Sequence, residues 1–249
     1  MTYSPLPMCS RYLIAEDHLR AILVRLGVPV SSALPRSRYN IPPGRPIPVV
    51  RAAPARAEGT ARHALISLHW GLVPSWARTD ESPIFNARAE SLADKPSFRD
   101  ALRRRRCLIP ASGFYEWKAI GPARQPWLFR RPAGEPFALA GLWDTWTAPD
   151  GSSRDSCTVI TTAPNALMAP IHHRMPVILG EDHWEAWLDP ARTEPAQLSA
   201  LLEPWPAEGL KATAVTRRVN KVDFDEPACL EPDTPAEAPR TEDQLGLGF

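Results

Sequence analysis

The sequence predicts a single α+β domain, with a largely antiparallel, barrel-like sheet and a few flanking helices. Three observations lead to this fold class. Short apolar runs of strand length recur along the chain and are separated by turn-forming residues. The 29 prolines among 249 residues favour short elements joined by turns and disfavour long helices. Few segments show the spacing of apolar residues that an amphipathic helix requires, so strands are expected to supply most of the core.

The first segment with helical spacing runs from Glu16 to Leu26. Leu19, Leu23 and Leu26 fall on one stripe of such a helix, and Gly27 follows as a stop signal. We therefore expect a helix here that buries this stripe.

A second, short helix is expected after Pro96. Ser97 is placed as its N-cap, and Asp100 lies three residues further on, like the acid of a capping box. The basic run from Arg103 to Arg106 suits the end of this helix, where the dipole favours cations, and otherwise forms a solvated helix face. Two further short helices are expected near residues 182–188 and 195–202.

The expected strands are short apolar runs between turn residues. They occupy residues 64–70, 107–109, 114–118, 127–130, 137–143 and 157–162, and residues 213–219 close the core. The run at 107–109 ends at Pro110 and has the composition of a buried strand.

Composition divides the chain into three parts. Residues 1–8 show no periodicity, and we expect a disordered extension or a start site further along the chain. Residues 9–222 are expected to fold as one domain. Residues 223–249 are acidic and Pro-rich and are expected to be disordered. Eight acids and one base give that tail a charge of −7, whereas residues 1–222 carry +8, which suits a polyanionic partner.

The cysteines and the hydropathy of the chain favour a cytoplasmic protein. Cys9, Cys107, Cys157 and Cys229 show no CxxC spacing, so we expect reduced thiols. No segment reaches transmembrane length, and the start of the chain lacks the features of a signal peptide. We therefore expect a cytoplasmic monomer with no membrane partner.

The stretch from Asn86 to Trp117 contains the first candidate for chemistry, Glu116. Strand alternation places Glu116 on one face with Phe114, and Tyr115 and Trp117 on the other. A carboxylate beside a phenyl ring is partly desolvated, which suits a general acid or base. The alternative is a Glu on an edge strand that pairs with an Arg.

Four reactive groups are candidates for one site: Cys9, Asn86, Glu116 and His172. A thiol, an amide, a carboxylate and an imidazole are the groups that a cysteine nucleophile needs. They are scattered along the sequence, so spacing does not show that they meet. The alternatives are a structural His172 and a Cys9 that packs as a small hydrophobe.

At these positions the chain resembles the SOS-response-associated peptidase (SRAP) family, also called abasic-site processing proteins. The resemblance covers roughly residues 8–232 and rests on blocks in the family's order. These blocks are Met8-Cys9-Ser10-Arg11-Tyr12, Arg38-Tyr39-Asn40, Trp70 to Trp76, Asn86-Ala87-Arg88-Ala89-Glu90, Gly113 to Trp117, Ile171 to Leu179 and Val219-Asn220-Lys221. His173 stands where the family usually has Asp.

The resemblance implies a DNA-repair enzyme that recognises abasic sites in single-stranded DNA and crosslinks to them through an N-terminal cysteine, here Cys9. An α-amino group with a pKa of roughly 7.7–8 condenses with the aldehyde of an open abasic sugar, and the thiol then closes a thiazolidine ring. By the same resemblance Glu116 moves protons, His172 assists as a second acid or base, and Asn86 orients the reacting groups. A nucleoid-associated location in the cytoplasm follows.

The resemblance also implies a set of DNA contacts. Arg11, Arg88 and Arg174 are expected to meet phosphates, Asn40 and Thr161 to line the strand, and Trp70 and Trp76 to stack on bases. Core packing is the alternative for both tryptophans, and we favour it for Trp70, which follows an apolar strand. No nucleotide-binding loop or metal-ligand cluster is present in the sequence, so no cofactor and no metal are expected.

The start of the chain departs from the family pattern, because eight residues precede Cys9. With them in place the nitrogen of Cys9 is an amide and cannot form a Schiff base. Either translation begins at Met8, which we favour, or the chain cleaves itself before Cys9. Two other functions stay open: a cysteine peptidase acting on itself or on other proteins, and a non-covalent binder of single-stranded DNA.

The last six residues, Gln244 to Phe249, fit the Gln-x-x-Leu-x-Phe pattern of peptides that resemble ligands of the bacterial replicative sliding clamp. Leu247 and Phe249 suit an apolar groove, and the Gln244 amide suits a polar rim. The alternative is a solvated tail that happens to end in Phe.

Overall fold

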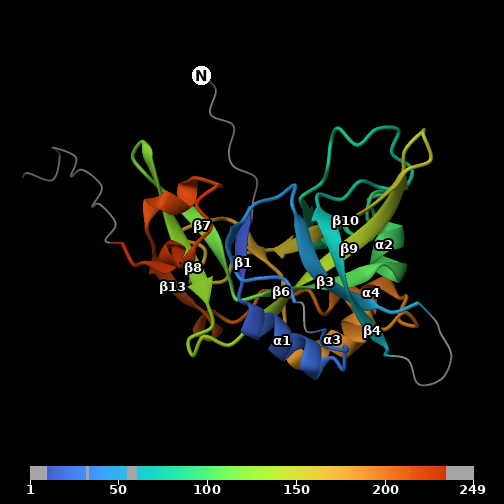
Figure 1. Ribbon diagram of the computed structural model, residues 1–249, viewed down its shortest axis with the longest axis horizontal. Coiled ribbons are helices and arrows are strands. Elements are labelled where there is room, and N and C mark those ends of the chain that lie inside the picture. The colour runs from blue at the N-terminus through green and yellow to red at the C-terminus, as the bar shows by residue number, and fades with distance from the viewer. Residues whose placement is uncertain (1–9, 32–33, 55–60, 234–249) are drawn as a thin grey trace, which may run out of the picture.

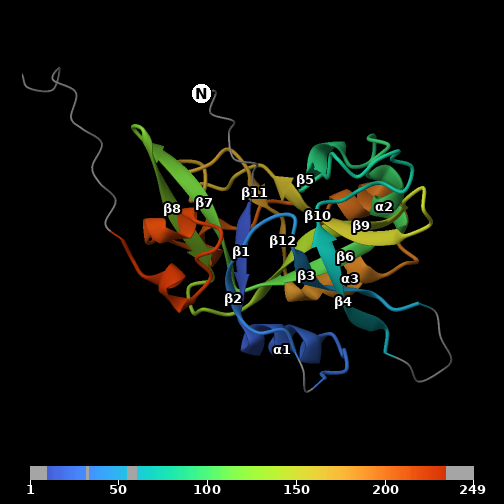
Figure 2. The ribbon, with the colours of Figure 1, turned by 45° about the horizontal axis from the view of Figure 1, so that its top comes forward.

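A computed structural model describes residues 10–31, 34–54 and 61–233 of the chain (Figure 1). Strands predominate, and two sheets lie side by side with helices around them (Figures 1 and 2). The predicted α+β class with a largely antiparallel, barrel-like sheet is confirmed.

Five strands of the larger sheet close into a barrel. Their order around the ring is β10, β4, β3, β6 and β9, and β9 pairs with β10 to complete it. The strands are β3 (Pro46–Ala52), β4 (His63–Trp70), β6 (Arg106–Ala111), β9 (Phe137–Thr147) and β10 (Ser153–Thr162). All neighbours in the ring are antiparallel except β4 and β10.

Three short strands extend the barrel wall. β5 (Asn86–Arg88) runs parallel to β10, and β11 (Met175–Pro176) pairs with the same strand in the antiparallel sense. β12 (Ile178–Leu179) pairs with β9. Segments from residues 86, 161 and 175 are therefore neighbours, although the sequence separates them widely.

The second sheet is antiparallel throughout and has the order β13-β8-β7-β1-β2. Its strands are β1 (Arg11–Ile14), β2 (Arg38–Ile41), β7 (Gly113–Ile120), β8 (Ala123–Arg130) and β13 (Lys211–Ala214). β7 lies between β8 and β1, so it is an interior strand of the sheet.

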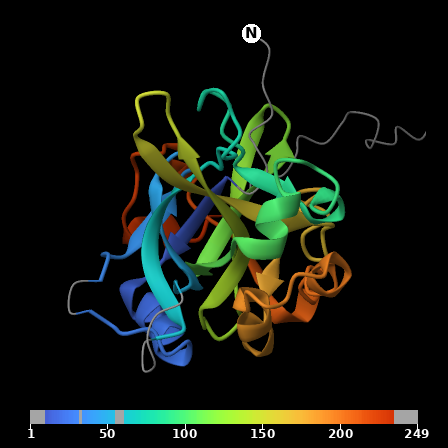
Figure 3. The ribbon, with the colours of Figure 1, turned by 90° about the vertical axis from the view of Figure 1, so that its right-hand side faces the viewer.

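In the described part of the chain, four α-helices flank the sheets: α1 (Glu16–Arg25), α2 (Arg99–Arg104), α3 (Glu181–Leu188) and α4 (Pro195–Ser199). Helix α1 and helix α3 lie at the same end of the molecule (Figures 1 and 3). The first predicted helix is confirmed, because Leu19, Leu23 and Leu26 are buried and Gly27 follows with a φ of 61°. None of the helices in the described ranges is long and apolar enough to cross a membrane.

The predicted N-cap of the second helix is wrong. Helix α2 begins at Arg99, and its N-cap is Phe98, which makes no side-chain capping bond. Phe98 is buried in the main core, so packing of its ring rather than the Ser97 hydroxyl fixes where the helix starts. Asp100 lies in the first turn of the helix, as expected.

The basic run at the end of α2 does not form one surface. Arg103 and Arg104 are exposed, whereas Arg106 is only 4% exposed and begins strand β6. The Arg106 guanidinium donates to the carbonyls of Trp187 at 2.6 Å and Leu102 at 2.8 Å, and burial lowers the pKa of Arg106 to about 10. This arginine therefore joins α2 and α3 to the barrel, and only part of the run is a solvated helix face.

The folded part of the chain continues beyond residue 222, where we expected the disordered tail to begin. Residues 227–230 form a 3-10 helix, Cys229 is fully buried, and Val215 forms a β-bridge with Pro232. Composition misled the prediction because the acids of this segment face solvent or pair with the body, while a few apolar side chains hold it down. The remainder of the acidic tail, residues 234–249, lies outside the described ranges.

Candidate active site

Glu116 lies at the centre of strand β7 and is only 3% exposed. Its neighbours alternate as predicted: Phe114 belongs to the main core, whereas Tyr115 and Trp117 pack in a smaller hydrophobic cluster on the other face. Because β7 is an interior strand, Glu116 is not the solvated edge-strand carboxylate of the alternative interpretation. A buried carboxylate in this setting requires polar neighbours.

The structure brings His172 to this carboxylate. The His172 Nδ1 atom lies 4.0 Å from Glu116 Oε1, and the imidazole is 18% exposed. That separation exceeds a direct hydrogen bond but is within the range of an ion pair or of transfer through one intervening group. Burial lowers the pKa of His172, the hydrogen bond to the backbone of Arg174 opposes this effect, and His173 lowers it further. His172 is therefore held toward its neutral form.

The turn from His172 to Arg174 fixes the imidazole. His172 Nδ1 lies 3.1 Å from the carbonyl oxygen of Arg174 and 3.2 Å from its amide nitrogen. The His173 ring lies next to it, with the ring centroids 4.5 Å apart and the planes tilted by 32°. His173 itself is exposed.

Asn86 begins strand β5, which the barrel strand β10 holds in place. Asn86 pairs with Val159, and Arg88 pairs with Thr161, in parallel register. On the other side of Thr161, Pro176 of β11 pairs with it in antiparallel register. Strand β10 therefore lies between two neighbours. On one side is β5, which carries Asn86 and Arg88, and on the other is β11, which follows the loop that carries His172.

Arg174 is tied to the same group of strands. Its guanidinium donates to both carboxylate oxygens of Glu90, at 2.7 and 2.8 Å, and to the carbonyl oxygen of Thr161 at 2.7 Å. The side chain of Arg174 is 12% exposed and that of Glu90 is 54% exposed. Arg88 is exposed, so the cation next to this pair is open to solvent.

Three of the polar residues expected to contact DNA are inside the protein. Asn40 and Thr161 are fully buried, and Arg11 is only 7% exposed. Arg11 donates to Asn40 Oδ1 at 2.9 Å and to the Val219 carbonyl at 3.0 Å, and burial lowers the pKa of Arg11. Thr161 Oγ1 faces the Ala87 carbonyl at 3.4 Å. These three side chains are used in internal contacts in this structure.

The two candidate tryptophans differ completely in exposure. Trp70 is fully buried, donates its indole N–H to the Phe85 carbonyl at 2.9 Å and packs edge-on against Tyr12. It has no free face for a base, so core packing, the alternative that we favoured, applies to Trp70. Trp76 is 63% exposed and has an indole surface that a base can reach.

Comparison with known proteins identifies the family of this site. Residues 8–222 match the family model for SOS response associated peptidase (SRAP). The chain belongs to the SRAP family. It is 40% identical to abasic site processing protein YoqW of Bacillus subtilis (strain 168) over 196 residues, which cover 78% of this chain and 85% of that protein. It is 32% identical to abasic site processing protein HMCES of Gallus gallus, over 79% of this chain and 66% of that protein.

Solved structures share the SRAP architecture described above. A protein of Bacteroides thetaiotaomicron superposes with a TM-score of 0.78 over 91% of this chain and all of that chain, at 24% identity, which shows the shared fold. A protein of Bordetella bronchiseptica superposes with a TM-score of 0.71 at 26% identity, over 84% of this chain and all of that chain.

The SRAP resemblance read from the sequence is therefore confirmed, and the roles of individual residues stay predictions. Cys9 lies outside the described residues, so its position relative to Glu116 and His172 is not given. Among residues 10–31, 34–54 and 61–233, no three His, Cys, Asp or Glu side chains are grouped in a way that could hold a metal ion.

Sequence reasoning missed two carboxylates of this SRAP domain. Glu90 lies in a quoted motif, but nothing in its spacing shows that Arg174 is its partner. Asp225 was assigned to the tail, although it accepts hydrogen bonds from the backbone of β2. The available signal for Glu90 was its place in the block Asn86-Ala87-Arg88-Ala89-Glu90, which contains an expected phosphate contact; Asp225 gave none.

Proposed function

We propose that this SRAP protein processes abasic sites in single-stranded DNA by forming a covalent thiazolidine link through Cys9, which shields the lesion. The observation that carries the proposal is the buried Glu116 carboxylate beside a His172 imidazole that is held toward its neutral form. Membership of the SRAP family and the names of its relatives, which are abasic site processing proteins, support the choice of substrate.

The chemistry requires both the α-amine and the thiol of Cys9. The amine nitrogen attacks the aldehyde carbon of the open abasic sugar, and loss of water leaves a C=N bond. The Cys9 sulfur then bonds to that carbon while a proton is delivered to the nitrogen, which closes a five-membered ring. No electrons are gained or lost overall, so the reaction needs no oxidant or reductant.

Glu116, His172 and Asn86 have distinct roles in this proposal. Glu116 moves protons during sugar opening and the Schiff-base steps, because a carboxylate shielded from water can act as a general acid or base. His172 serves as the second acid or base. Asn86, placed by the pairing of β5 with β10, orients the amine or the sugar oxygen through its amide.

Exposed cationic and aromatic side chains suit a single strand of DNA. Arg88 offers a solvent-facing cation for a phosphate, and Trp76 offers an indole face for a base next to the lesion. Arg174 would share its guanidinium between Glu90 and a phosphate. We assign Arg11, Asn40, Thr161 and Trp70 to the frame of the site, because their side chains are buried in internal contacts.

A free α-amine on Cys9 is a condition of this function. Either synthesis starts at Met8 and the methionine is removed, or the chain cleaves itself before Cys9. The family match begins at residue 8, directly before Cys9, which supports this cysteine as the reactive one.

The test compares two proteins that begin at position 9. The wild-type chain should form an adduct with abasic single-stranded DNA that survives heating on a denaturing gel. Cys9→Ser should reach a Schiff base that borohydride traps but should form no heat-stable adduct. Equal heat-stable adduct from Cys9→Ser would exclude the thiazolidine mechanism.

A thiol peptidase is the second candidate, and the family description favours it. In that reading Cys9, His172 and Glu116 would act on the chain itself or on other proteins. The intact mass of purified full-length protein tests for self-cleavage. Loss of residues 1–8 from the purified chain, prevented by Glu116→Gln, would establish self-cleavage, whereas an unchanged mass would limit the peptidase reading to other proteins.

Residues 244–249 extend the proposal to a partner. They lie outside the described residues, so the argument rests on the Gln-x-x-Leu-x-Phe pattern in an acidic, Pro-rich segment. We infer weak binding to the replicative sliding clamp, on the order of micromolar, with tethering raising the local concentration at DNA. A peptide of residues 239–249 should bind the host clamp, and a control with Leu247→Ala and Phe249→Ala should not.

A further inference from the structure

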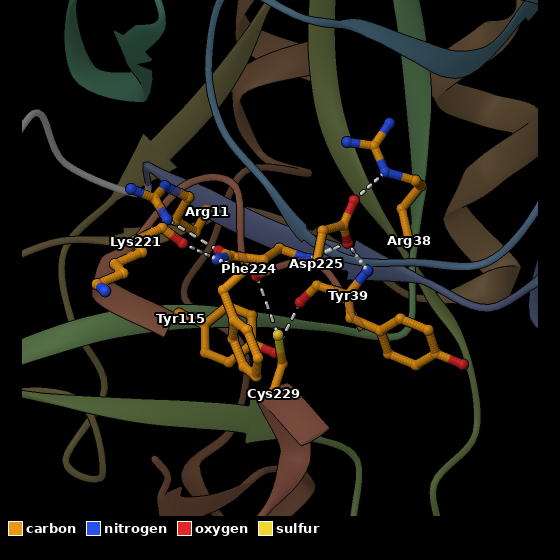
Figure 4. A network of polar contacts seen from close by, with 9 residues as sticks. Arg11, Arg38, Tyr39, Tyr115, Lys221, Phe224, Asp225 and Cys229 are labelled. Carbon is orange, nitrogen blue, oxygen red and sulfur yellow. Dashed lines mark hydrogen bonds and ion pairs between the residues drawn. The ribbon is translucent and has the colours of Figure 1, made fainter. Parts of the chain in front are cut away.

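Residues 221–233, which we call the C-terminal strap, pack against the start of strand β1 and against β2 (Figure 4). The strap is fastened to β13 and its neighbours by backbone hydrogen bonds from Thr216 to Glu231 and from Asp233 to Ala214, each of 2.9 Å. Cys229 of the strap is fully buried, and its thiol donates to the Phe224 carbonyl at 3.3 Å. The strap is thus a fixed part of the fold.

The carboxylate of Asp225 joins the strap to strand β2. It accepts hydrogen bonds from the backbone amides of Tyr39 at 2.5 Å and Asn40 at 2.9 Å, and it forms an ion pair with Arg38. The side chain of Asp225 is 17% exposed, so these bonds are largely shielded from water. Charge-assisted bonds of this kind are stronger than bonds between neutral groups.

Asn40 continues this connection with a fully buried side chain. Its amide nitrogen, which has two hydrogens to donate, lies within hydrogen-bond distance of three carbonyl oxygens: Val219 at 3.1 Å, Lys221 at 2.9 Å and Phe224 at 2.9 Å. Its amide oxygen accepts from Arg11 Nη1 at 2.9 Å. One side chain therefore joins β2, the strap and the first residue of β1.

Arg11 completes the network at the start of the domain. Its guanidinium also donates to the Val219 carbonyl at 3.0 Å and lies 5.7 Å from the centre of the Trp117 ring. In the β1–β7 register Arg11 pairs with Tyr115, so the beginning of β1 lies beside the strand that carries Glu116. Two residues span at most about 7 Å, so the position of Arg11 limits where Cys9 can be.

We propose that the C-terminal strap positions Cys9 for reaction, with Asp225 as a positioning residue that acts through Asn40 and Arg11. The proposal rests on the proposed function, in which Cys9 is the nucleophile. It gives Arg11 and Asn40 a role other than contact with DNA: their polar atoms are already paired inside the protein, and exposing them to bind a phosphate would leave buried carbonyls without donors. Displacement of a reacting group by an ångström is enough to slow a reaction by about 10²-fold.

The test uses full chains that begin at Cys9 and compares Asp225→Ala and Asp225→Asn with Glu226→Ala. Glu226 is the matched control, because it is the next residue and its side chain forms an exposed ion pair with Arg218, while its backbone carbonyl, which accepts from Cys229, is kept in the variant. At saturating abasic DNA, Asp225→Ala should form the adduct at least about tenfold more slowly, while its Kd for undamaged single-stranded DNA changes by less than about twofold. Asp225→Asn keeps an acceptor for the β2 amides, so its rate of adduct formation should lie between those of Asp225→Ala and the wild type. Glu226→Ala should react at the wild-type rate.

Hydrogen exchange gives a readout that does not depend on the reaction. The amides of Tyr39 and Asn40 should exchange faster in Asp225→Ala than in Glu226→Ala. Wild-type crosslinking rates in an Asp225→Ala or Asp225→Asn chain that shows this faster exchange would overturn the positioning role. If Asp225→Ala fails to fold, the same comparison with Asp225→Asn decides.

Arg11→Lys separates positioning from phosphate contact, because lysine keeps the charge but lacks the planar guanidinium whose Nη1 donates to both Asn40 Oδ1 and the Val219 carbonyl. Positioning predicts a slower saturated rate with an unchanged Kd, and an unchanged rate with a weaker Kd would overturn it. Failure of the wild-type chain to crosslink at all would instead refute the proposed function.

Discussion

Arg174 and Glu90 form a bidentate ion pair, with N–O distances of 2.7 and 2.8 Å, at the edge of the group that contains Glu116 and His172. This geometry is the one that a guanidinium adopts with a phosphate. The hydrogen bonds from Arg174 lower the pKa of Glu90, so the carboxylate stays ionised at neutral pH. A DNA phosphate that approaches Arg174 therefore meets a carboxylate already in place.

Glu90→Gln should strengthen the binding of single-stranded DNA. The change removes a negative charge from the proposed path of the strand and frees the Arg174 guanidinium for a phosphate. We expect affinity to rise by about two- to fivefold at low salt, since exposed ion pairs contribute at most about 1 kcal/mol. Fluorescence anisotropy at several salt concentrations measures this. The control is Glu16→Gln on α1, at the far end of the molecule, which carries the same charge change (Figure 2); equal gains in both variants would show only an effect of net charge.

Glu116→Ala should slow formation and reversal of the adduct much more than it weakens binding. A proton shuttle lowers barriers and adds little affinity, so we expect a loss of about 10²-fold in rate at saturating DNA. Single-turnover gels give the rate and anisotropy gives the Kd. Glu116→Gln, which keeps the volume and a hydrogen-bonding amide, controls for loss of packing in this buried position. Weaker binding with a normal saturated rate would show that the role is wrong.

Arg88→Ala should weaken binding and flatten its dependence on salt. An exposed cation that neutralises one phosphate of a single strand contributes about 0.7 to the slope of log K against log salt. Arg104→Ala provides the comparison, because Arg104 is an exposed arginine at the end of α2 that the proposal does not place at the DNA. If both variants kept the wild-type slope, Arg88 would not contact a phosphate.

Local patterns in the sequence predicted what depends on local geometry. The period of two along β7 correctly separated Phe114 from Tyr115, because successive side chains of a strand point to opposite faces. The stripe of leucines in α1 was found for the corresponding reason, its 3.6-residue period. The meeting of Glu116 and His172 was only a hypothesis, since no local rule joins residues on different elements.

Contacts between distant segments were not predictable in this way. Arg11 and the Val219 carbonyl are 208 positions apart, so their hydrogen bond follows from the sheet topology rather than from any local spacing. The sequence does not show this partner, so Arg11 was expected to be free to contact a DNA phosphate. Asp225 was misplaced for a similar reason: a charged, Pro-rich composition predicts disorder, but three donors on residues 38–40 hold its carboxylate.

Trp76→Ala should reduce affinity for single-stranded DNA. Stacking of a base on an indole contributes about 1–3 kcal/mol, which corresponds to roughly a 5- to 150-fold change in Kd, and Trp76 is 63% exposed. Trp76→Phe should retain part of this effect. Val24→Ala is the control, because Val24 is a similarly exposed apolar residue, at 64%, on helix α1. Unchanged affinity in Trp76→Ala would show that the indole does not stack on a base of the bound strand.

His173→Asp should move the pH dependence of adduct formation. The two imidazoles lie 4.5 Å apart, and His173 lowers the pKa of His172 in addition to the effect of burial. An aspartate in this place would instead favour the protonated imidazole and raise the pKa of His172. If neutral His172 accepts a proton in the reaction, the rate falls as pH decreases through this pKa, so the fall should begin at higher pH in the variant.

The measurement is the saturated single-turnover rate between about pH 5 and pH 8, the range in which histidine titrates. The wild type should keep its rate to lower pH than His173→Asp. The pH at which His173→Asn loses rate should lie between those two, because this variant removes the effect of His173 on the pKa of His172 without adding a negative charge. His183→Asp on α3 serves as a control for the change in net charge, since His183 is a solvent-facing histidine next to Asp182. A shift in the same direction and of the same size in His183→Asp would mean that overall charge, and not the His172–His173 contact, sets the profile. A rate that instead falls as pH rises, with that fall displaced to higher pH in His173→Asp, would show that the reaction depends on the protonated form of His172.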